Sequence, residues 1–166
     1  PEEVAAAAGI ITARYRAPAL IAAWCGLRWG QLGELRRRDI SDNAETICVE
    51  RGFEHDGGCR IDTPKSGKAR VVVVPPHIRA DLKHHLDVHA ADDPEALLLT
   101  GRAACGHISA STFRKAWHEA LKGTGCQRVR LHDLRHYAGV MTVRTGATLS
   151  ENMSRLGHAT AAASLI

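Results

Sequence analysis

Two basic side chains three residues apart, His132 and Arg135, have the right types and spacing to hold a phosphate group. Residues three apart share one face of a helix. An arginine guanidinium can donate two parallel hydrogen bonds to a phosphate, and an imidazole adds a further donor beside it. Because a His-x-x-Arg pair is common by chance, it indicates phosphate chemistry only weakly on its own.

Two further cations stand earlier in the chain. Arg28 ends an apolar run, where a charge needs a partner or a cleft. The competing interpretation is an arginine that reaches out to solvent. Lys65 lies in the turn PKSGK at 64–68, from which an ammonium group could give a proton to a bound polyanion. Lys68 competes for that role, and either lysine could simply be solvated.

The last basic site is His158, which closes the triplet LGH at 156–158. The glycine allows a tight turn directly before the histidine, although the triplet alone is more typical of a polar helix start. Three consecutive arginines at 36–38 are equally well explained as a solvated helix end. Each of these basic sites is therefore weak when taken alone.

The elements that must position these residues are mostly helical. Apolar periodicity predicts helices over 2–8, 17–29 and 31–38 in the first part of the chain. Ser109 and Asp133 are predicted to be the N-caps of two later helices. After a strand-rich middle, the predicted helices cover 76–89, 109–122, 133–145, 149–156 and 159–166.

The middle of the chain has the composition of strands. The runs 46–50, 60–63 and 70–74 are rich in β-branched residues, and they predict an antiparallel sheet of three strands. Two prolines at 75–76 end the last of them. The predicted fold class is α+β, mainly α: a helical domain with a small three-stranded antiparallel sheet.

Length and composition exclude several classes of protein. The 166 residues suffice for one domain with one core, and 45% apolar with 24% charged residues excludes a disordered chain, a collagen-like chain and a coiled-coil rod. The longest uncharged apolar stretch, 17–27, is far shorter than the roughly 20 residues that a bilayer span needs. The net charge of +4 permits an anionic partner without requiring one.

The cysteines argue against disulfides and zinc knuckles. They are five in number, widely spaced, and contain no Cys-x-x-Cys pair. Cys25 and Cys48 stand in apolar runs and are expected to be buried thiols. We therefore expect a reducing compartment and a cytoplasmic location. The start, PEE, has no signal-peptide pattern and no methionine, so we expect a domain cut from a longer protein.

Taken in order, the basic sites form the pattern Arg28, Lys65, His-x-x-Arg and LGH across a helix–sheet–helix layout. With this pattern the chain resembles the tyrosine recombinases, or phage integrases, and in particular their C-terminal catalytic domain. The resemblance covers essentially the whole chain. It is supported by GLRWG at 26–30, the run 35–40, PKS at 64–66, HDLRH at 132–136 and LGH at 156–158.

The resemblance implies phosphoryl transfer on double-stranded DNA without a metal ion or cofactor. A tyrosine would form a 3′-phosphotyrosyl link and release a 5′-hydroxyl, and a second strand would reverse the step. Two arginines would clamp the phosphate, a lysine would protonate the leaving oxygen, and two histidines would assist proton transfer and hydrogen-bond the phosphate. By position these catalytic residues are Arg28 and Arg135, Lys65, His132, and His158.

The chain departs from the family pattern at the nucleophile, which lies nine residues after the LGH histidine. That place is position 167, beyond Ile166. Tyr15 is far from the motif, and Tyr137 is expected to pack within its helix. We therefore expect a monomeric fragment that keeps the phosphate-activating residues but cannot cleave a strand. Gln31 replaces a common glutamate; it can orient a neighbour but gives Arg28 no counter-charge.

The parent protein would carry N-terminal DNA-binding domains and assemble as a tetramer on DNA. Two other interpretations remain: a non-catalytic basic helical DNA-binding module and a type IB topoisomerase relative. A binding module needs scattered positive charge but has no use for this ordered set of residues. The LGH histidine and the small size favour an integrase. We predict that the two arginines and two histidines converge on one concave basic surface.

Overall fold

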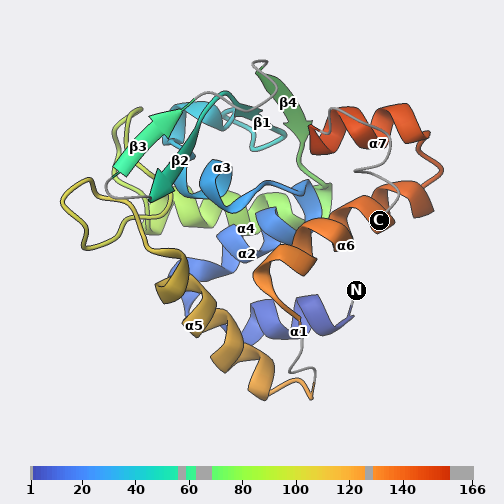
Figure 1. Ribbon diagram of the computed structural model, residues 1–166, viewed down its shortest axis with the longest axis horizontal. Helices are drawn as coiled ribbons and strands as arrows, with labels where there is room; N and C mark the ends of the chain where they lie inside the picture. Colours follow the sequence, from blue (N-terminus) through green and yellow to red (C-terminus); the bar gives the residue numbers. More distant parts are fainter. Residues whose placement is uncertain (1, 56–58, 63–68, 126–128, 158–166) are drawn as a thin grey trace.

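Helices surround the core of the protein, and two short β-ribbons lie along one side of it (Figure 1). The computed structural model describes residues 2–55, 59–62, 69–125 and 129–157. The strands are β1 (Thr46–Val49), β2 (Gly52–His55), β3 (Cys59–Asp62) and β4 (Arg70–Val73). The helices are α1 (Glu2–Ile10), α2 (Ala13–Cys25), α3 (Trp29–Glu34), the 3₁₀ helix η1 (Arg37–Asp39), α4 (Pro76–Val88), α5 (Ala110–Lys122), α6 (Leu131–Arg144) and α7 (Leu149–Leu156).

Helix α2 is the centre of the core. It packs against α1, α3, α4, α5 and α6, and its Ala19, Ile21 and Ala23 are completely buried. A helix that is apolar on nearly all sides must be covered by other elements. Trp117 and Phe113 of α5 fill the space beside it. The predicted class, a mainly helical α+β domain with antiparallel strands, is confirmed.

Helix α2 ends earlier than the predicted helix over 17–29. Gly26 has φ +67°, a left-handed conformation that favours glycine, and it breaks the predicted helix into α2 and α3. A Cβ on Gly26 would also lie 2.5 Å from Cδ2 of Leu156, so α7 packs directly on this corner. The break places Arg28 in the short connection between the two helices.

The predicted three-stranded sheet is wrong in its arrangement. β1 pairs with β4 and β2 pairs with β3, which makes two antiparallel two-stranded ribbons within the described residues. The strand β2, which was not predicted, is not part of the β1–β4 ribbon and packs on α3. The packing is close, because a Cβ on Gly30 would lie 2.5 Å from the carbonyl oxygen of Phe53. The polar sequence of β2 carries no apolar alternation, so its strand character was not visible.

The predicted helix over 31–38 is wrong, because α3 ends at Glu34, the backbone leaves the helical conformation at Leu35, and Arg37–Asp39 form the separate 3₁₀ helix η1. Two later boundaries follow the predictions closely. α7 covers the predicted 149–156, and the Ser109 hydroxyl caps α5 by accepting a hydrogen bond from the Thr112 amide at 3.2 Å. Asp133 is not the N-cap of α6. The helix begins two residues earlier, and the Asp133 carboxylate accepts a hydrogen bond from the Arg130 amide at 2.8 Å. The predicted helix over 159–166 lies outside the described residues.

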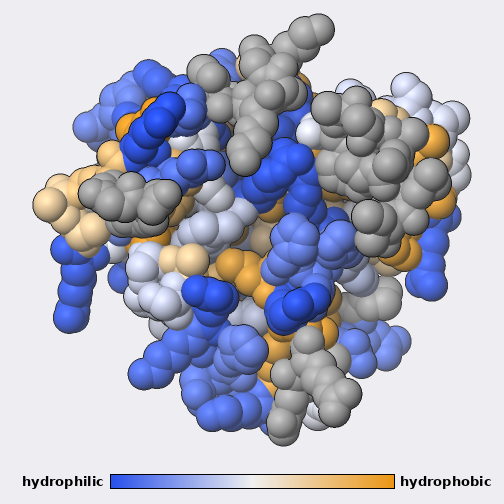
Figure 2. All heavy atoms as spheres, in the orientation of Figure 1, coloured by the Kyte–Doolittle hydropathy of each residue, from blue (hydrophilic) through white to orange (hydrophobic). Residues whose placement is uncertain are grey.

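The surface in the orientation of Figure 1 is mostly hydrophilic, with apolar side chains gathered near its centre (Figure 2). Across the described ranges, no helix combines the length and the apolar character needed to cross a membrane.

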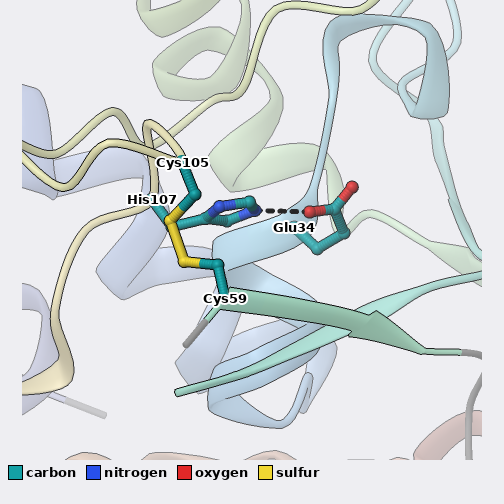
Figure 3. Close-up of a disulfide and its surroundings, with 4 residues drawn as sticks. All are labelled: Glu34, Cys59, Cys105 and His107. Carbon is teal, nitrogen blue, oxygen red and sulfur yellow. Dashed lines mark hydrogen bonds and ion pairs between the residues drawn. A yellow bond between two sulfur atoms is a disulfide. The ribbon is translucent and has the colours of Figure 1, made fainter. Parts of the chain in front are cut away.

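The expectation that the cysteines form no disulfide is wrong for one pair. Cys59 of β3 is joined to Cys105 of the loop before α5, across 46 positions of sequence (Figure 3). Linear spacing could not reveal this pair because the fold brings β3 against that loop. Cys25 is buried as expected, and burial raises the pKa of its thiol to about 12. Cys48 is only half-buried.

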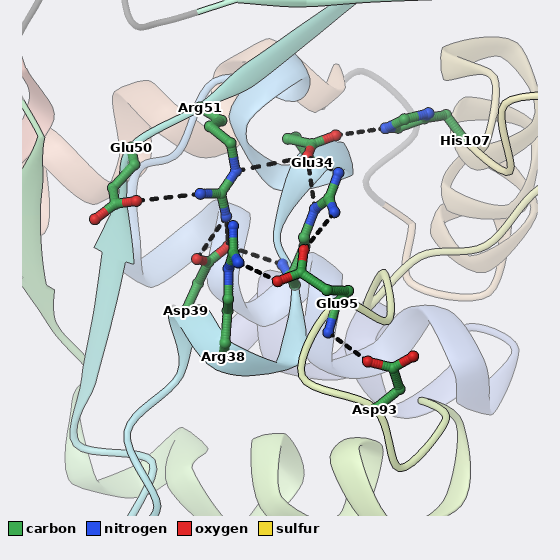
Figure 4. Close-up of polar contacts among 9 residues, drawn as sticks. Glu34, Arg38, Asp39, Glu50, Arg51, Asp93, Glu95 and His107 are labelled. Atoms are coloured by element: carbon green, nitrogen blue, oxygen red, sulfur yellow. Dashed lines mark hydrogen bonds and ion pairs between the residues drawn. The ribbon is translucent and has the colours of Figure 1, made fainter.

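The three arginines at 36–38 are paired with carboxylates. The Arg36 guanidinium contacts Glu34 at 2.7 Å and Glu95 at 2.7 Å, and Arg38 also contacts Glu95 (Figure 4). Arg37 reaches Asp92 at 3.3 Å. These side chains fasten the segment after α3 to the loop after α4, so the positive charge of the three arginines is compensated by carboxylates within the fold.

Candidate active site

Arg135 projects from α6 into the corner where α2 ends. Its guanidinium is buried and donates hydrogen bonds to two main-chain carbonyl oxygens, those of Gly26 and of Leu156, the latter at 2.6 Å. Both oxygens stand at helix ends, where carbonyl groups have no hydrogen-bond partner within the helix. They orient the guanidinium but, being uncharged, do not neutralise it. Arg135 thereby ties α6, the end of α2 and the end of α7 together.

Arg28 and Arg70 approach the same corner from other elements. Arg28 Nη2 lies 3.4 Å from the Gly157 carbonyl oxygen, and Arg70 Nε donates to the Arg155 carbonyl oxygen at 3.1 Å. The buried Gln31 joins the two arginines. Its Oε1 accepts from the Arg28 amide at 3.1 Å and from Arg70 Nη2 at 3.0 Å. As expected, this neutral amide orients neighbouring groups.

The three arginines have no counter-charge within the described part of the chain. Among the described residues, no carboxylate forms an ion pair with Arg28, Arg70 or Arg135, whereas arginines elsewhere in the fold do have such partners. Burial, and then the nearby positive charges of Arg28 and Arg70, lower the pKa of Arg135 to about 9. Burial and the charge of Arg28 lower the pKa of Arg70 to about 10. The corner is therefore prepared for an anion.

His132 lies beside this corner on the first turn of α6. It shares with Arg28 and Arg135 the wall of a cavity of about 360 Å³. Burial, followed by the charges of His136 and Arg135, lowers the pKa of His132 below its ordinary value. A neutral imidazole can accept a proton at neutral pH. The rest of the lining comes from Ala22, Leu27, Trp29, Leu32, Ala110, Arg114 and Leu131.

The structure thus brings together three of the five residues singled out from the sequence: Arg28, His132 and Arg135. Lys65, its competitor Lys68, and His158 lie outside the described residues. Within the LGH triplet, the carbonyl oxygens of its first two residues accept hydrogen bonds from the arginines.

Sequence reasoning missed Arg70 and Arg114. Arg70 opens a strand of valines, and a charge at the start of such a run was the signal that could have marked it. Arg114 lies on the first turns of α5 and also lines the cavity. Its neighbours in sequence carry no motif, so only the packing of α5 against α2 places it there.

The two tyrosines lie away from the cavity. The Tyr137 ring packs edge-on against Trp24 at 5.3 Å, and its buried hydroxyl has no hydrogen-bond partner within the described part of the chain. Burial raises the pKa of this hydroxyl. Tyr15 packs edge-on against Phe113 at 5.4 Å. Neither residue contributes to the wall that carries Arg28 and His132.

Comparison with known proteins identifies the family of this chain. The model of the phage integrase family matches residues 2–163. The prophage phiRv2 integrase of Mycobacterium tuberculosis is 40% identical over 154 residues, which are 91% of this chain and 41% of that protein. The integrase of Mycobacterium phage D29 is 36% identical over 166 residues, covering 96% of this chain and 44% of the relative. The chain therefore spans less than half the length of these two relatives.

Solved structures share the fold. The XerA recombinase superposes with a TM-score of 0.79 at 23% identity, over 99% of this chain and 55% of that one. The Tn1549 transposon integrase, solved with circular intermediate DNA, superposes with a TM-score of 0.78 at 17% identity, over 99% of this chain and 60% of that one. With the family model matching nearly its whole length, the chain belongs to the phage integrase family.

Proposed function

We propose that this chain is the catalytic domain of a site-specific DNA recombinase that cleaves and rejoins strands through a 3′-phosphotyrosyl intermediate. The observation that carries the proposal is the cluster of Arg28, Arg70 and Arg135. It has no carboxylate partner among the described residues and adjoins a cavity lined by His132. In the transition state of phosphoryl transfer, negative charge is spread over the equatorial oxygens of the phosphate. Preorganised guanidinium groups stabilise that charge, so a metal ion is not needed in this mechanism.

The proposed reaction moves one proton at each end of the transferred phosphate. A tyrosine oxygen attacks phosphorus while its proton passes to the neutral imidazole of His132. The bond to the 5′-oxygen of the next nucleotide breaks, and Lys65 supplies the proton that this oxygen needs. Arg28 and Arg135 hold the non-bridging oxygens, and His158 adds a hydrogen bond. Lys68 remains the competing proton donor.

The attacking tyrosine of this proposal is neither of the two in the chain. Tyr137 has its hydroxyl buried beside Trp24, and Tyr15 packs on Phe113. We assign the role to position 167, nine residues after His158. The 166-residue polypeptide alone is then unable to form a covalent adduct with DNA, and it binds DNA weakly, as a monomer and with strong salt dependence.

In the intact protein we propose further N-terminal DNA-binding domains, assembly as a tetramer on double-stranded DNA, and action in the cytoplasm. The comparisons support DNA as the partner, because the Tn1549 integrase and the XerH recombinase were solved with DNA. Two duplexes exchange four strands in recombination, and four active sites match that number.

The test is covalent capture on a nicked duplex that carries the cognate site. The protein is the full-length form with a tyrosine at position 167, and the readout is a protein–DNA adduct after denaturation. Arg135→Lys should lower adduct formation by at least about 100-fold, because a single ammonium cannot replace the guanidinium fork. Arg144→Lys, at the exposed end of α6, is the matched control.

Two results would contradict the proposal. Equal adduct yields from Arg135→Lys and the wild type would remove the cluster from catalysis. Tight binding to the cognate duplex with no adduct would favour the non-catalytic DNA-binding module.

A further inference from the structure

We propose that Cys59, Cys105 and His107 form a zinc site when the disulfide between the two cysteines is reduced. Their ligand atoms all lie within 4.8 Å of one another. Two thiolates and one imidazole are donors that zinc prefers, and structural zinc ions are commonly held by cysteine and histidine together. The ligands come from β3 and from the loop before α5, so an ion here would fasten two separate parts of the fold.

His107 is oriented as a metal ligand would be. The side chain is 4% exposed, and its Nε2 lies 2.5 Å from Oε2 of Glu34. This contact places the ring proton on Nε2 and leaves the lone pair on Nδ1. Nδ1 is buried and has no hydrogen-bond partner within the described part of the chain. In zinc sites the ligating histidine commonly donates its other ring N–H to a carboxylate, which fixes the orientation of the ring.

The surroundings of His107 hold it in this orientation. Figure 3 shows the ring between the disulfide on one side and Glu34 on the other. Phe53 stacks on the ring with centroids 4.5 Å apart. The Glu34 carboxylate is anchored through its other oxygen, which contacts Arg36 at 2.7 Å and Arg51 at 3.6 Å (Figure 4). A disulfide alone requires neither the imidazole nor this anchored carboxylate.

The change between the two states balances with a thiol as reductant. Two equivalents of a low-molecular-weight thiol reduce the disulfide to the Cys59 and Cys105 thiols and are oxidised to their own disulfide. Zinc then binds with release of the two thiol protons. Cys105 is exposed, which gives both the reductant and the ion a path to the site. The fourth ligand is water, as in zinc sites that have three protein ligands.

Metal binding by the purified full-length protein tests the proposal. Reduced under thiol and incubated with zinc, then desalted, the wild type should retain about one zinc ion per chain by elemental analysis. Cobalt in place of zinc should give a thiolate-to-cobalt charge-transfer band and the intense visible bands of a tetrahedral site. The same protein oxidised to the disulfide should lose both signals and regain them on reduction. This comparison uses no substituted residue, so a variant that fails to fold cannot explain the result.

Variants then assign the ligands. Cys59→Ser and Cys105→Ser should abolish retention of the ion, whereas Cys48→Ser, a thiol outside the cluster, should leave it unchanged. Glu34→Gln should weaken zinc affinity by about 10- to 100-fold, because it removes the carboxylate behind His107. Absence of zinc from the reduced wild type, or equal retention by Cys59→Ser, would overturn the proposal.

Discussion

The guanidinium of Arg70 lies directly against Gly157, so that a Cβ on this glycine would lie 2.9 Å from Arg70 Nη1. Gly157 also has φ +65° and ends α7 in the left-handed conformation. The middle residue of the LGH triplet is therefore a glycine for two independent reasons. One reason is the backbone turn, and the other is room for the half-buried guanidinium of Arg70.

Gly157→Ala should destabilise the protein by more than the backbone strain alone. Strain at a positive φ is about 1 kcal/mol in the free energy of unfolding, and displacing the Arg70 guanidinium should add about another 1 kcal/mol. Urea unfolding measures the difference. Gly146→Ala is the matched control, because Gly146 has φ +85° and open space around its Cβ position. Equal losses from the two variants would show that the contact with Arg70 is unimportant.

Arg70→Gln should weaken DNA binding by about fivefold at low salt, the equivalent of ~1 kcal/mol, because it removes one charge from the unneutralised cluster. The loss should shrink as salt is raised. Arg60→Gln removes the same charge from an exposed site, where the side chain is 78% accessible, and should have a smaller effect. Fluorescence anisotropy of a labelled duplex measures the DNA affinity of both variants. Equal losses of affinity would show that Arg70 acts only through the net charge of the protein.

The parts of the site that could be predicted from the sequence are those set by local spacing. His132 and Arg135 share a helix face, and the helix before LGH has the predicted bounds. Arg28 was identifiable by its place in a family pattern. Arg70 was not, because its role depends on β4 lying beside α7, where its contact with Arg155 joins residues 85 positions apart in sequence.

The pairing of the strands and the disulfide also could not be predicted from local sequence. β2 has a polar sequence, and its Phe53 packs closely on Gly30 and Gly33 of α3. Cys59 and Cys105 meet only because the ribbon that carries Cys59 folds against the loop before α5. Contacts between distant segments leave no periodic signal in either segment, so sequence patterns predict the elements better than their neighbours.

The stability of the protein should fall as the pH is lowered from 7 to 5. His85 is 2% exposed, its Nε2 donates to the Leu98 carbonyl oxygen at 2.8 Å, and burial lowers its pKa in the folded state. Below about pH 6.5 the unfolded chain takes up a proton at this histidine that the folded chain does not, so acid favours unfolding. At neutral pH both states are uncharged there and the effect vanishes.

Urea unfolding at several pH values measures this slope. His85→Gln can keep a donor toward Leu98 but cannot titrate, so the dependence between pH 7 and 5 should become shallower. His118→Gln is the control, because His118 is exposed on α5. An unchanged slope in His85→Gln would show that other groups cause the acid sensitivity.

Tyr137→Phe should leave DNA cleavage intact and should not lower stability. The Tyr137 hydroxyl is buried without a partner in the described part of the chain, so its removal relieves an unpaired polar group while the ring keeps its contact with Trp24. The free energy of unfolding should stay equal or rise by up to about 1 kcal/mol.

In full-length protein with a tyrosine at position 167, the adduct yield of Tyr137→Phe should match that of the wild type, and Tyr15→Phe should give the same yield. Peptide mapping of the adduct decides the assignment: DNA linked to Tyr137 or Tyr15 would place the nucleophile inside this chain and refute the role proposed for position 167.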